Sequence, residues 1–217
     1  MSVLICMPCY GGNVSEKTTV GLFNLGKTLV REGIDHGILT IANESLITKG
    51  RSKMANFFIN NTEHEYLFFL DADVGFDPQD VLKLLSHKKE LVSGSYPMKT
   101  IPLKWNFSIS QPAKRENNLI AIDRIGIGFT LIHRSVFHKI REKYGKELKY
   151  IPDSNGLNQP SSAEMNNSYY YFSEMKHSGY FLPEDFSFFM RAKSCGIQPW
   201  MDVSINLSHV GSHVFAE

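Results

Sequence analysis

The sequence predicts a single α/β domain, a sandwich in which helices cover a mainly parallel, twisted sheet. Through the first hundred residues, apolar segments of strand length alternate with amphipathic segments of helix length, which is typical of such sheets. The segment Tyr66–Leu70 (YLFFL) is apolar without alternation, as expected of a parallel strand with both faces covered. The chain has 217 residues, a length that fits one domain.

The composition narrows the classes of function. Lys and Arg number 23 and Asp and Glu 22, and no long basic run occurs, so a nucleic-acid groove is not indicated. No apolar stretch approaches the roughly 20 residues of a membrane span. Cys6 and Cys9 have the C-x-x-C spacing, but no second such pair occurs and the third cysteine, Cys195, lies far away. This pattern favours reduced thiols over a zinc site. Because Val3–Met7 already fits a buried strand, we expect no signal peptide and predict a cytoplasmic protein.

The first strand and helix follow from the opening residues. The apolar run Val3–Met7 is closed by Pro8 and Gly11–Gly12, which predicts a buried strand and a loop. A helix is expected from about Ser15 to Arg31, because apolar residues recur there at helical spacing. The buried face of this helix is predicted to consist of Leu22, Phe23, Leu29 and Val30.

A phosphate-loop pattern lies inside this predicted helix. Gly21–Thr28 (GLFNLGKT) fits G-x-x-x-x-G-K-[ST] letter for letter. A true phosphate loop follows a strand directly, because its backbone N–H groups wrap the phosphates at the first turn of the next helix. The nearest strand ends near Met7, so a P-loop NTPase remains an alternative that the position disfavours. Lys27 is expected to be a solvent-exposed helix residue.

Alternating elements continue to residue 95. Strands are expected at 37–41, 66–70 and 91–95, and a helix at about 48–60 whose apolar side is Met54, Ala55, Phe58 and Ile59. Asp77 and Pro78 suit the N-cap and the first position of a helix that reaches about His87. The second half is less regular, with strands at 105–110 and 129–133, a helix at 135–144 and a polar, mobile loop at 153–167.

Two carboxylates end the third predicted strand. Asp71 and Asp73 are separated by one residue, so on a strand they point to the same side. They lie at the carboxyl end of a parallel strand, where open α/β sheets bind ligands. Two carboxylates on one side favour a neutralising cation, and hard divalent ions accept oxygen ligands. The pattern therefore predicts a metal or ligand site; the alternative is a turn in which both aspartates cap backbone N–H groups.

Three further motifs follow Asp71-Ala72-Asp73 in order: Gly126–Phe129 (GIGF), Pro183-Glu184-Asp185 and Leu207–Gly211 (LSHVG). Together, over residues 3–211, they resemble the GT-A family of nucleotide-sugar-dependent glycosyltransferases. The resemblance implies a GT-A fold, a nucleotide-sugar donor such as a UDP-sugar, a glycan or other hydroxyl acceptor, and Mn²⁺ or Mg²⁺. It also implies a nucleotide-binding part at about 1–100 and an acceptor-binding, catalytic part at about 101–217. The glycine motif has an alternative as a turn that needs positive φ.

The resemblance also implies roles for single residues. Asp73 would bind the metal directly, Asp71 would act through water or by holding the ribose, and His209 would add a nitrogen ligand. Asp185 would be the general base that takes the acceptor proton, with Glu184 orienting the acceptor or the start of the helix. The plain alternative for Glu184 and Asp185 is an ordinary helix N-terminus, where the dipole favours acids.

Other site residues are implied by position. Pro8, Cys9 and Tyr10 end the first strand, where the family holds the nucleoside base, and Tyr10 could stack on uracil. Arg51 matches a family position that meets the base or the phosphates. The sugar and acceptor pocket is expected to be lined by Tyr96, Lys99 and Trp105.

Two other functions fit the motifs less well. Haloacid-dehalogenase-type phosphatases use D-x-D-x-[TV], which Asp71–Val74 fits loosely. Their first aspartate is a nucleophile after the first strand, whereas two strand–helix units precede Asp71 here. A non-catalytic nucleotide-sugar-binding module is the third possibility, and the presence of both Asp185 and His209 disfavours it.

Overall fold

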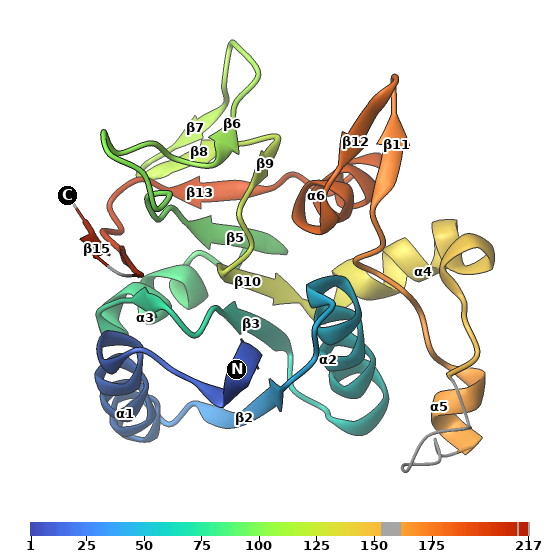
Figure 1. Ribbon diagram of the computed structural model, residues 1–217, viewed down its shortest axis with the longest axis horizontal. Coiled ribbons are helices and arrows are strands. Elements are labelled where there is room, and N and C mark those ends of the chain that lie inside the picture. The colour runs from blue at the N-terminus through green and yellow to red at the C-terminus, as the bar shows by residue number, and fades with distance from the viewer. Residues whose placement is uncertain (153–161, 212, 217) are drawn as a thin grey trace.

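An eight-stranded central sheet organises the chain in the computed structural model, which describes residues 1–152, 162–211 and 213–216 (Figure 1). The strand order is β2-β1-β3-β10-β5-β13-β8-β7. The pairs β1–β2, β1–β3 and β5–β13 are parallel, and β10 is antiparallel to both β3 and β5. The predicted mainly parallel α/β class is thus confirmed, with β10 and β8 running against the common direction. The strands are β1 (Ser2–Cys9), β2 (Asp35–Ala42), β3 (Tyr66–Leu70), β5 (Leu91–Gly94), β7 (Arg115–Glu116), β8 (Leu119–Ala121), β10 (Phe129–His133) and β13 (Trp200–Asp202).

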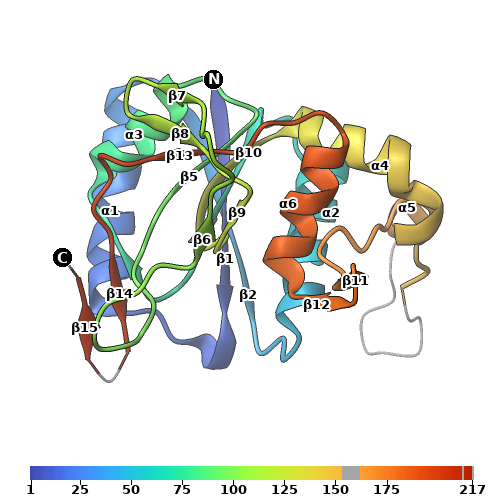
Figure 2. The ribbon, with the colours of Figure 1, turned by 90° about the horizontal axis from the view of Figure 1, so that it is seen from above.

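Helices cover both faces of this sheet, as Figure 2 shows. The helices α1 (Glu16–Arg31) and α3 (Pro78–Ser86) pack together on one face. The other face carries α2 (Ile47–Asn61), α4 (Arg134–Leu148) and α6 (Glu184–Ser194). The bounds agree with the predicted helices, and Asp77 caps α3 in a capping box with Asp80, as its sequence indicates.

Strand β3 lies at the centre of both cores. All five of its residues are buried, which confirms the interpretation of its unalternating sequence. Leu67 and Phe69 join the core under α2, α4 and α6, whereas Phe68 and Leu70 join the core under α1 and α3. Burial of each such side chain stabilises the fold by about 1.5–3 kcal/mol. The strand therefore holds the loop that follows it, Asp71–Asp73, in a fixed place.

The buried face of α1 matches the predicted one only in part, with Leu29 buried and Leu22 partly buried. Its buried residues include Thr18, Gly21 and Leu25, whereas Phe23 and Val30 are 68% and 70% exposed. The helix approaches its neighbours through small residues: a Cβ on Gly21 would lie 2.8 Å from Phe76, and the Thr18 hydroxyl donates to the Val74 carbonyl. Periodicity detects large apolar residues and so missed this close contact.

The phosphate-loop pattern lies wholly within α1. Most of its backbone N–H groups are therefore committed to the helix instead of facing a loop that could wrap phosphates. Lys27 is exposed, with its ammonium 5.2 Å from the centre of the Phe23 ring. The expectation of an ordinary helix is confirmed.

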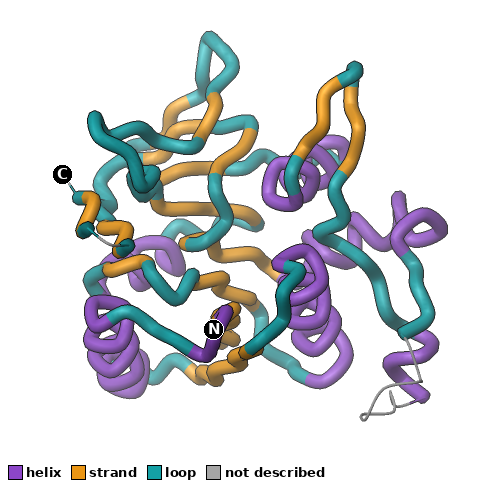
Figure 3. Tube along the Cα trace, viewed as in Figure 1, coloured by secondary structure: helices purple, strands orange, loops and turns teal. Residues whose placement is uncertain are grey.

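Short elements extend from the main sheet (Figure 3). The segment predicted as a strand at 105–110 keeps only β6 (Phe107–Ser108), which pairs with β9 (Arg124–Ile125) outside the main sheet. Of the predicted loop at 153–167, residues 153–161 lie outside the described residues, and α5 (Ser162–Asn166) is helical. The remaining elements are η1 (Tyr10–Gly12), the hairpin β11 (Met175–His177) and β12 (Tyr180–Leu182), and the ribbon of β4 (Val74–Gly75), β14 (Ser208–Val210) and β15 (Val214–Phe215).

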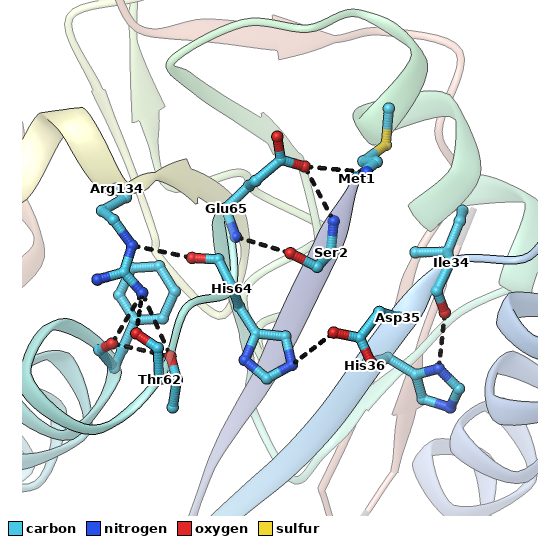
Figure 4. A network of polar contacts seen from close by, with 10 residues as sticks. Met1, Ser2, Ile34, Asp35, His36, Thr62, His64, Glu65 and Arg134 are labelled. Carbon is cyan, nitrogen blue, oxygen red and sulfur yellow. Dashed lines mark hydrogen bonds and ion pairs between the residues drawn. The ribbon is translucent and has the colours of Figure 1, made fainter.

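Arg134 closes the end of α2 (Figure 4). Its guanidinium donates hydrogen bonds to the carbonyl oxygens of Phe58, Ile59, Thr62 and His64, at 2.6 to 3.2 Å. The last carbonyls of a helix lack partners within the helix, and a cation there also opposes the helix dipole. Arg134 therefore fixes how α2, which carries a site residue, sits against β10 and α4.

None of the helices in the described ranges has the length and hydropathy needed to cross a bilayer. The three cysteines are free thiols, and Cys6 and Cys9 are buried.

Candidate functional site

A cavity of about 590 Å³ opens beside the carboxyl ends of β1, β2 and β3. Parallel sheets bind ligands at this edge, and the volume suits a small-molecule ligand. The residues predicted on this side come together in its wall: Pro8, Cys9, Tyr10, Arg51, Asp71 and Asp73. Tyr10 is 77% exposed, so most of its side chain is open to solvent.

Asp71 and Asp73 face different cations. The strand ends at Leu70 and the two aspartates lie on a turn, so the premise that they share one side of a strand is wrong. Asp71 Oδ1 accepts from Arg51 Nη2 at 2.9 Å, and Asp73 Oδ2 accepts from Lys99 Nζ at 2.6 Å. In the described residues both carboxylates therefore pair with cationic side chains, which a turn that only caps backbone N–H groups does not require.

Arg51 is buried among carboxylates. It projects from α2, is 4% exposed, and contacts Glu184 Oε1 through Nε at 3.7 Å as well as Asp71. Its guanidinium also lies 5.2 Å from the Phe69 ring centre. Within the described residues its Nε and Nη1 atoms have no hydrogen-bond acceptor. Arg51 therefore links the loop after β3 to the start of α6.

His209 is placed by strand pairing. In the β14–β4 ladder it lies opposite Val74, the residue after Asp73. Its Nδ1 lies 2.9 Å from the Pro97 carbonyl oxygen, which can only accept, so Nδ1 carries the proton. The Nε2 atom then faces Asp73 Oδ1 at 3.4 Å. Burial alone would raise the pKa of Asp73, but the hydrogen bonds and charges of His209 and Lys99 outweigh it and bring the pKa down to about 2.

This donor pair fits a divalent cation. Because Nδ1 faces the Pro97 carbonyl, Nε2 is the ring nitrogen that faces Asp73, and a proton or a metal ion between Nε2 and Oδ1 makes that approach favourable. A carbonyl partner that fixes the tautomer is the usual support of a ligating histidine. In the described part of the chain no three His, Cys, Asp or Glu residues gather as a complete site. Of the three predicted metal residues, Asp73 and His209 face each other, and Asp71 is paired with Arg51.

Asp185 lies at the first turn of α6 and is 8% exposed. Burial is the main cause that raises its pKa, Glu184 adds to it, and the Phe186 N–H bond and Arg51 oppose it; the result is about 6. A carboxylate with this pKa is ionised at neutral pH and basic enough to accept a proton. Asp185 and Glu184 do not line the 590 Å³ cavity, but Glu184 contacts Arg51, which does.

The glycine motif touches the first aspartate. The Gly128 carbonyl accepts from Asp71 N–H at 2.8 Å, and Gly128 N–H donates to Tyr96 Oη at 3.1 Å. A Cβ on Gly128 would lie 2.2 Å from Asp71 Oδ2. Neither Gly126 nor Gly128 has positive φ, so the turn explanation is wrong. Glycine is needed here because two chain segments approach closely.

The three residues predicted to line the sugar pocket, Tyr96, Lys99 and Trp105, do not lie in one cavity. Lys99 contacts Asp73, and the Tyr96 ring lies 5.0 Å from the His209 ring in an edge arrangement. Trp105 instead lines a neighbouring cavity of about 290 Å³, together with Pro97. Tyr96 and Lys99 thus belong to the site, and Trp105 lies next to it.

Sequence reasoning missed several wall residues of the main cavity. Asn13, Ser15, Glu44 and Ser45 line it from the loops after β1 and β2. Glu44 is held by Lys53 at 2.8 Å and Lys49 at 3.8 Å. Glu44 could have been found from the sequence, because it lies just beyond the carboxyl end of a parallel strand, as Asp71 does.

Comparisons with models of known protein families and with curated proteins found no match. The crystal structure of A197 from STIV matches all of this chain and 94% of its own, with 18% identity and a TM-score of 0.55. GalNAc-T7, with UDP, GalNAc and Mn²⁺, matches 97% of this chain and 43% of its own, with 10% identity and a TM-score of 0.49. UDP-glucose pyrophosphorylase complexed with UDP-glucose matches 93% and 90%, with 8% identity and a TM-score of 0.47. The likeness to A197 shows a shared fold.

Proposed function

We propose that this chain is a metal-dependent glycosyltransferase that moves a sugar from a nucleotide-sugar, a UDP-sugar in the first instance, to a hydroxyl acceptor. The observation that carries the proposal is the arrangement around Arg51. On one side lies the 590 Å³ cavity with Asp71 and Asp73, and on the other lie Glu184 and the buried base candidate Asp185. A donor site and a proton acceptor are thus adjacent.

The position of each residue suggests its role in the proposed reaction. Pro8, Cys9 and Tyr10 would receive the base, which places nucleotide binding in the first hundred residues. Asp73 and His209 would hold Mn²⁺ or Mg²⁺, which as a Lewis acid offsets the charge of the leaving diphosphate. Lys99 adds a positive charge beside Asp73.

Proton transfer falls to Asp185. As the acceptor hydroxyl attacks the anomeric carbon, the ionised Asp185 carboxylate would accept its proton. Glu184 is engaged by Arg51, so it would position the start of α6 and the acceptor. Both roles place acceptor binding in the second half of the chain.

The phosphatase alternative is less consistent with these contacts. It requires Asp71 as an unencumbered nucleophile, yet Asp71 Oδ1 accepts from buried Arg51 and its N–H is held by Gly128. A pure binding module would gain nothing from burying the ionisable Asp185 beside Glu184, because that burial disfavours the charged form.

Product analysis tests the proposed reaction. The wild-type chain is incubated with Mn²⁺, a panel of nucleotide sugars and mixed acceptor glycans, and free UDP and inorganic phosphate are measured separately. We expect UDP to be released from at least one UDP-sugar, with EDTA and Asp73→Asn abolishing the release. Release of inorganic phosphate instead of UDP would support the phosphatase hypothesis and contradict the proposed glycosyltransferase function.

A further inference from the structure

A third cavity, of about 600 Å³, lies beside the first turn of α6. Its walls come from the β11–β12 hairpin, the start of α6 and the β6–β9 ribbon; Figure 1 shows β9 and the hairpin on either side of α6. Pro183 and Phe186 belong to the wall and flank Glu184 and Asp185 in the sequence. The cavity therefore lies beside the helix turn that carries the proposed base, although Asp185 itself does not line it, and it shares no lining residue with the donor cavity.

Exposed aromatic rings form the hairpin side of this cavity. Tyr180 is 74% exposed and Phe181 72% exposed, although aromatic side chains ordinarily bury most of their surface. The hairpin turns at Ser178 and Gly179, both with positive φ, so the rings stand on a defined two-residue turn. Open aromatic surface that borders a cavity is typical of a ligand-binding wall.

Arg124 supplies a charge on the opposite side. Its guanidinium carbon lies 4.1 Å from the centre of the Phe186 ring, and Nε donates to Ser108 Oγ at 3.1 Å. The adjacent Asp123 carboxylate is engaged by Lys193 and Ser110. No carboxylate of the described residues forms an ion pair with Arg124. A stacked guanidinium held at Nε presents its remaining N–H groups as a fork that suits a carboxylate or a phosphate.

We propose that this cavity holds the acceptor and that Arg124 selects an acceptor sugar bearing a carboxylate or phosphate group. That the bound sugar is the acceptor rests on the proposed glycosyltransferase function. The C–H faces of a sugar ring are apolar and pack on aromatic rings, which Tyr180, Phe181 and Phe186 provide. The anionic substituent would pair with Arg124, while another hydroxyl of the same ring is directed to the first turn of α6, where Asp185 lies.

Binding measurements without nucleotide test this selectivity. Methyl glucuronide, glucose 6-phosphate and neutral methyl glucoside are titrated against the whole chain by ligand-observed NMR. The acidic probes are expected to bind at least about tenfold more tightly than the neutral one, the effect of one hydrogen bond to a charged group. Which acidic probe binds better distinguishes a carboxylate from a phosphate.

Variants locate the effect. Arg124→Met is expected to remove the preference for the acidic probes and leave neutral-sugar binding unchanged. Arg115→Met, an exposed arginine on β7, removes the same charge away from the cavity and is expected to change nothing. Phe181→Ser is expected to weaken all three sugars.

Three results would overturn the assignment: equal binding of acidic and neutral sugars, an equal loss in both arginine variants, or sedimentation with anionic lipid vesicles in place of sugar binding. The proposed function fails separately. If UDP with Mn²⁺ does not bind any of these proteins, the donor site is refuted, while the nucleotide-free sugar titrations still decide the role of Arg124.

Discussion

Asp71 and Asp73 have different electrostatic partners, and this difference separates their tasks. The Asp71 carboxylate neutralises Arg51, whose side chain is 5% exposed. Asp73 and its partner Lys99 are 37% and 39% exposed, so their pair is screened by water. We therefore expect Asp71 to contribute mainly to stability, and we propose that Asp73 contributes mainly to ligand binding.

Substitution at these two positions should affect stability unequally. Asp71→Asn leaves a buried guanidinium with only the longer Glu184 contact, and we expect the free energy of unfolding to fall by about 2–4 kcal/mol. Asp73→Asn should lower it by less than about 1 kcal/mol, because an exposed pair contributes little. Urea denaturation at pH 7 measures both, and equal losses would contradict the division.

The raised pKa of Asp185 predicts a pH dependence of activity. Its pKa of about 6 means that the carboxyl is protonated, and inactive as a base, below that pH. We expect kcat/KM to rise with pH through about 6 and then level off. Asp185→Asn keeps the acceptor for Phe186 N–H and should lower kcat by about 10²–10⁴-fold and remove the rise. A variant that keeps the same pH profile would show that another group is the base.

Gly128 is expected to tolerate no side chain. A Cβ there would lie 2.2 Å from Asp71 Oδ2 and 2.7 Å from Tyr96 Oη, so Gly128→Ala must displace the first aspartate. We expect it to lower the free energy of unfolding by about 1–3 kcal/mol and to weaken nucleotide binding. Gly26→Ala in α1 is the matched control, since its Cβ would meet nothing within 4 Å. Tight nucleotide binding by Gly128→Ala would contradict the close approach.

At the scale of elements, the position of α2 depends on its two ends. Arg51 near its start joins it to the site, and Arg134 from α4 caps its last carbonyls. Arg134→Leu should lower the free energy of unfolding by about 2–3 kcal/mol, because charged hydrogen bonds to several carbonyls are lost. Arg31→Leu, an exposed arginine at the end of α1, is the control and should change stability little. Thermal denaturation followed by circular dichroism compares the two.

Local sequence patterns accounted for most elements but not for their contacts. The unalternating β3 and the capping box of α3 are encoded by neighbouring residues, so their bounds were predictable. The face of α1 was predictable only in part, because it also depends on small residues that fit against Phe76. Short strands such as β6 were overestimated because their pairing partners lie far along the chain.

Across the whole molecule, the carboxyl edge of the sheet was the most informative prediction. It places Pro8, Tyr10 and Asp73 at one cavity, as expected, because parallel strands end at the same edge. Sequence could not show that Arg51 would pair with Asp71 and Glu184, since those partners are 20 and 133 residues away along the chain. The aromatic cavity beside α6 was equally hidden, because its walls come from three separate segments.

We propose above all that the cavity beside β1 and β3 binds a nucleoside diphosphate through a divalent ion. The most direct test is titration calorimetry with UDP, with Mn²⁺ and with EDTA, on wild type and Asp73→Ala, and with ATP and Mg²⁺ as the competing ligand. We predict UDP binding that requires Mn²⁺ and that Asp73→Ala abolishes. Tight ATP binding without UDP binding, or UDP binding that Asp73→Ala leaves intact, would contradict the claim.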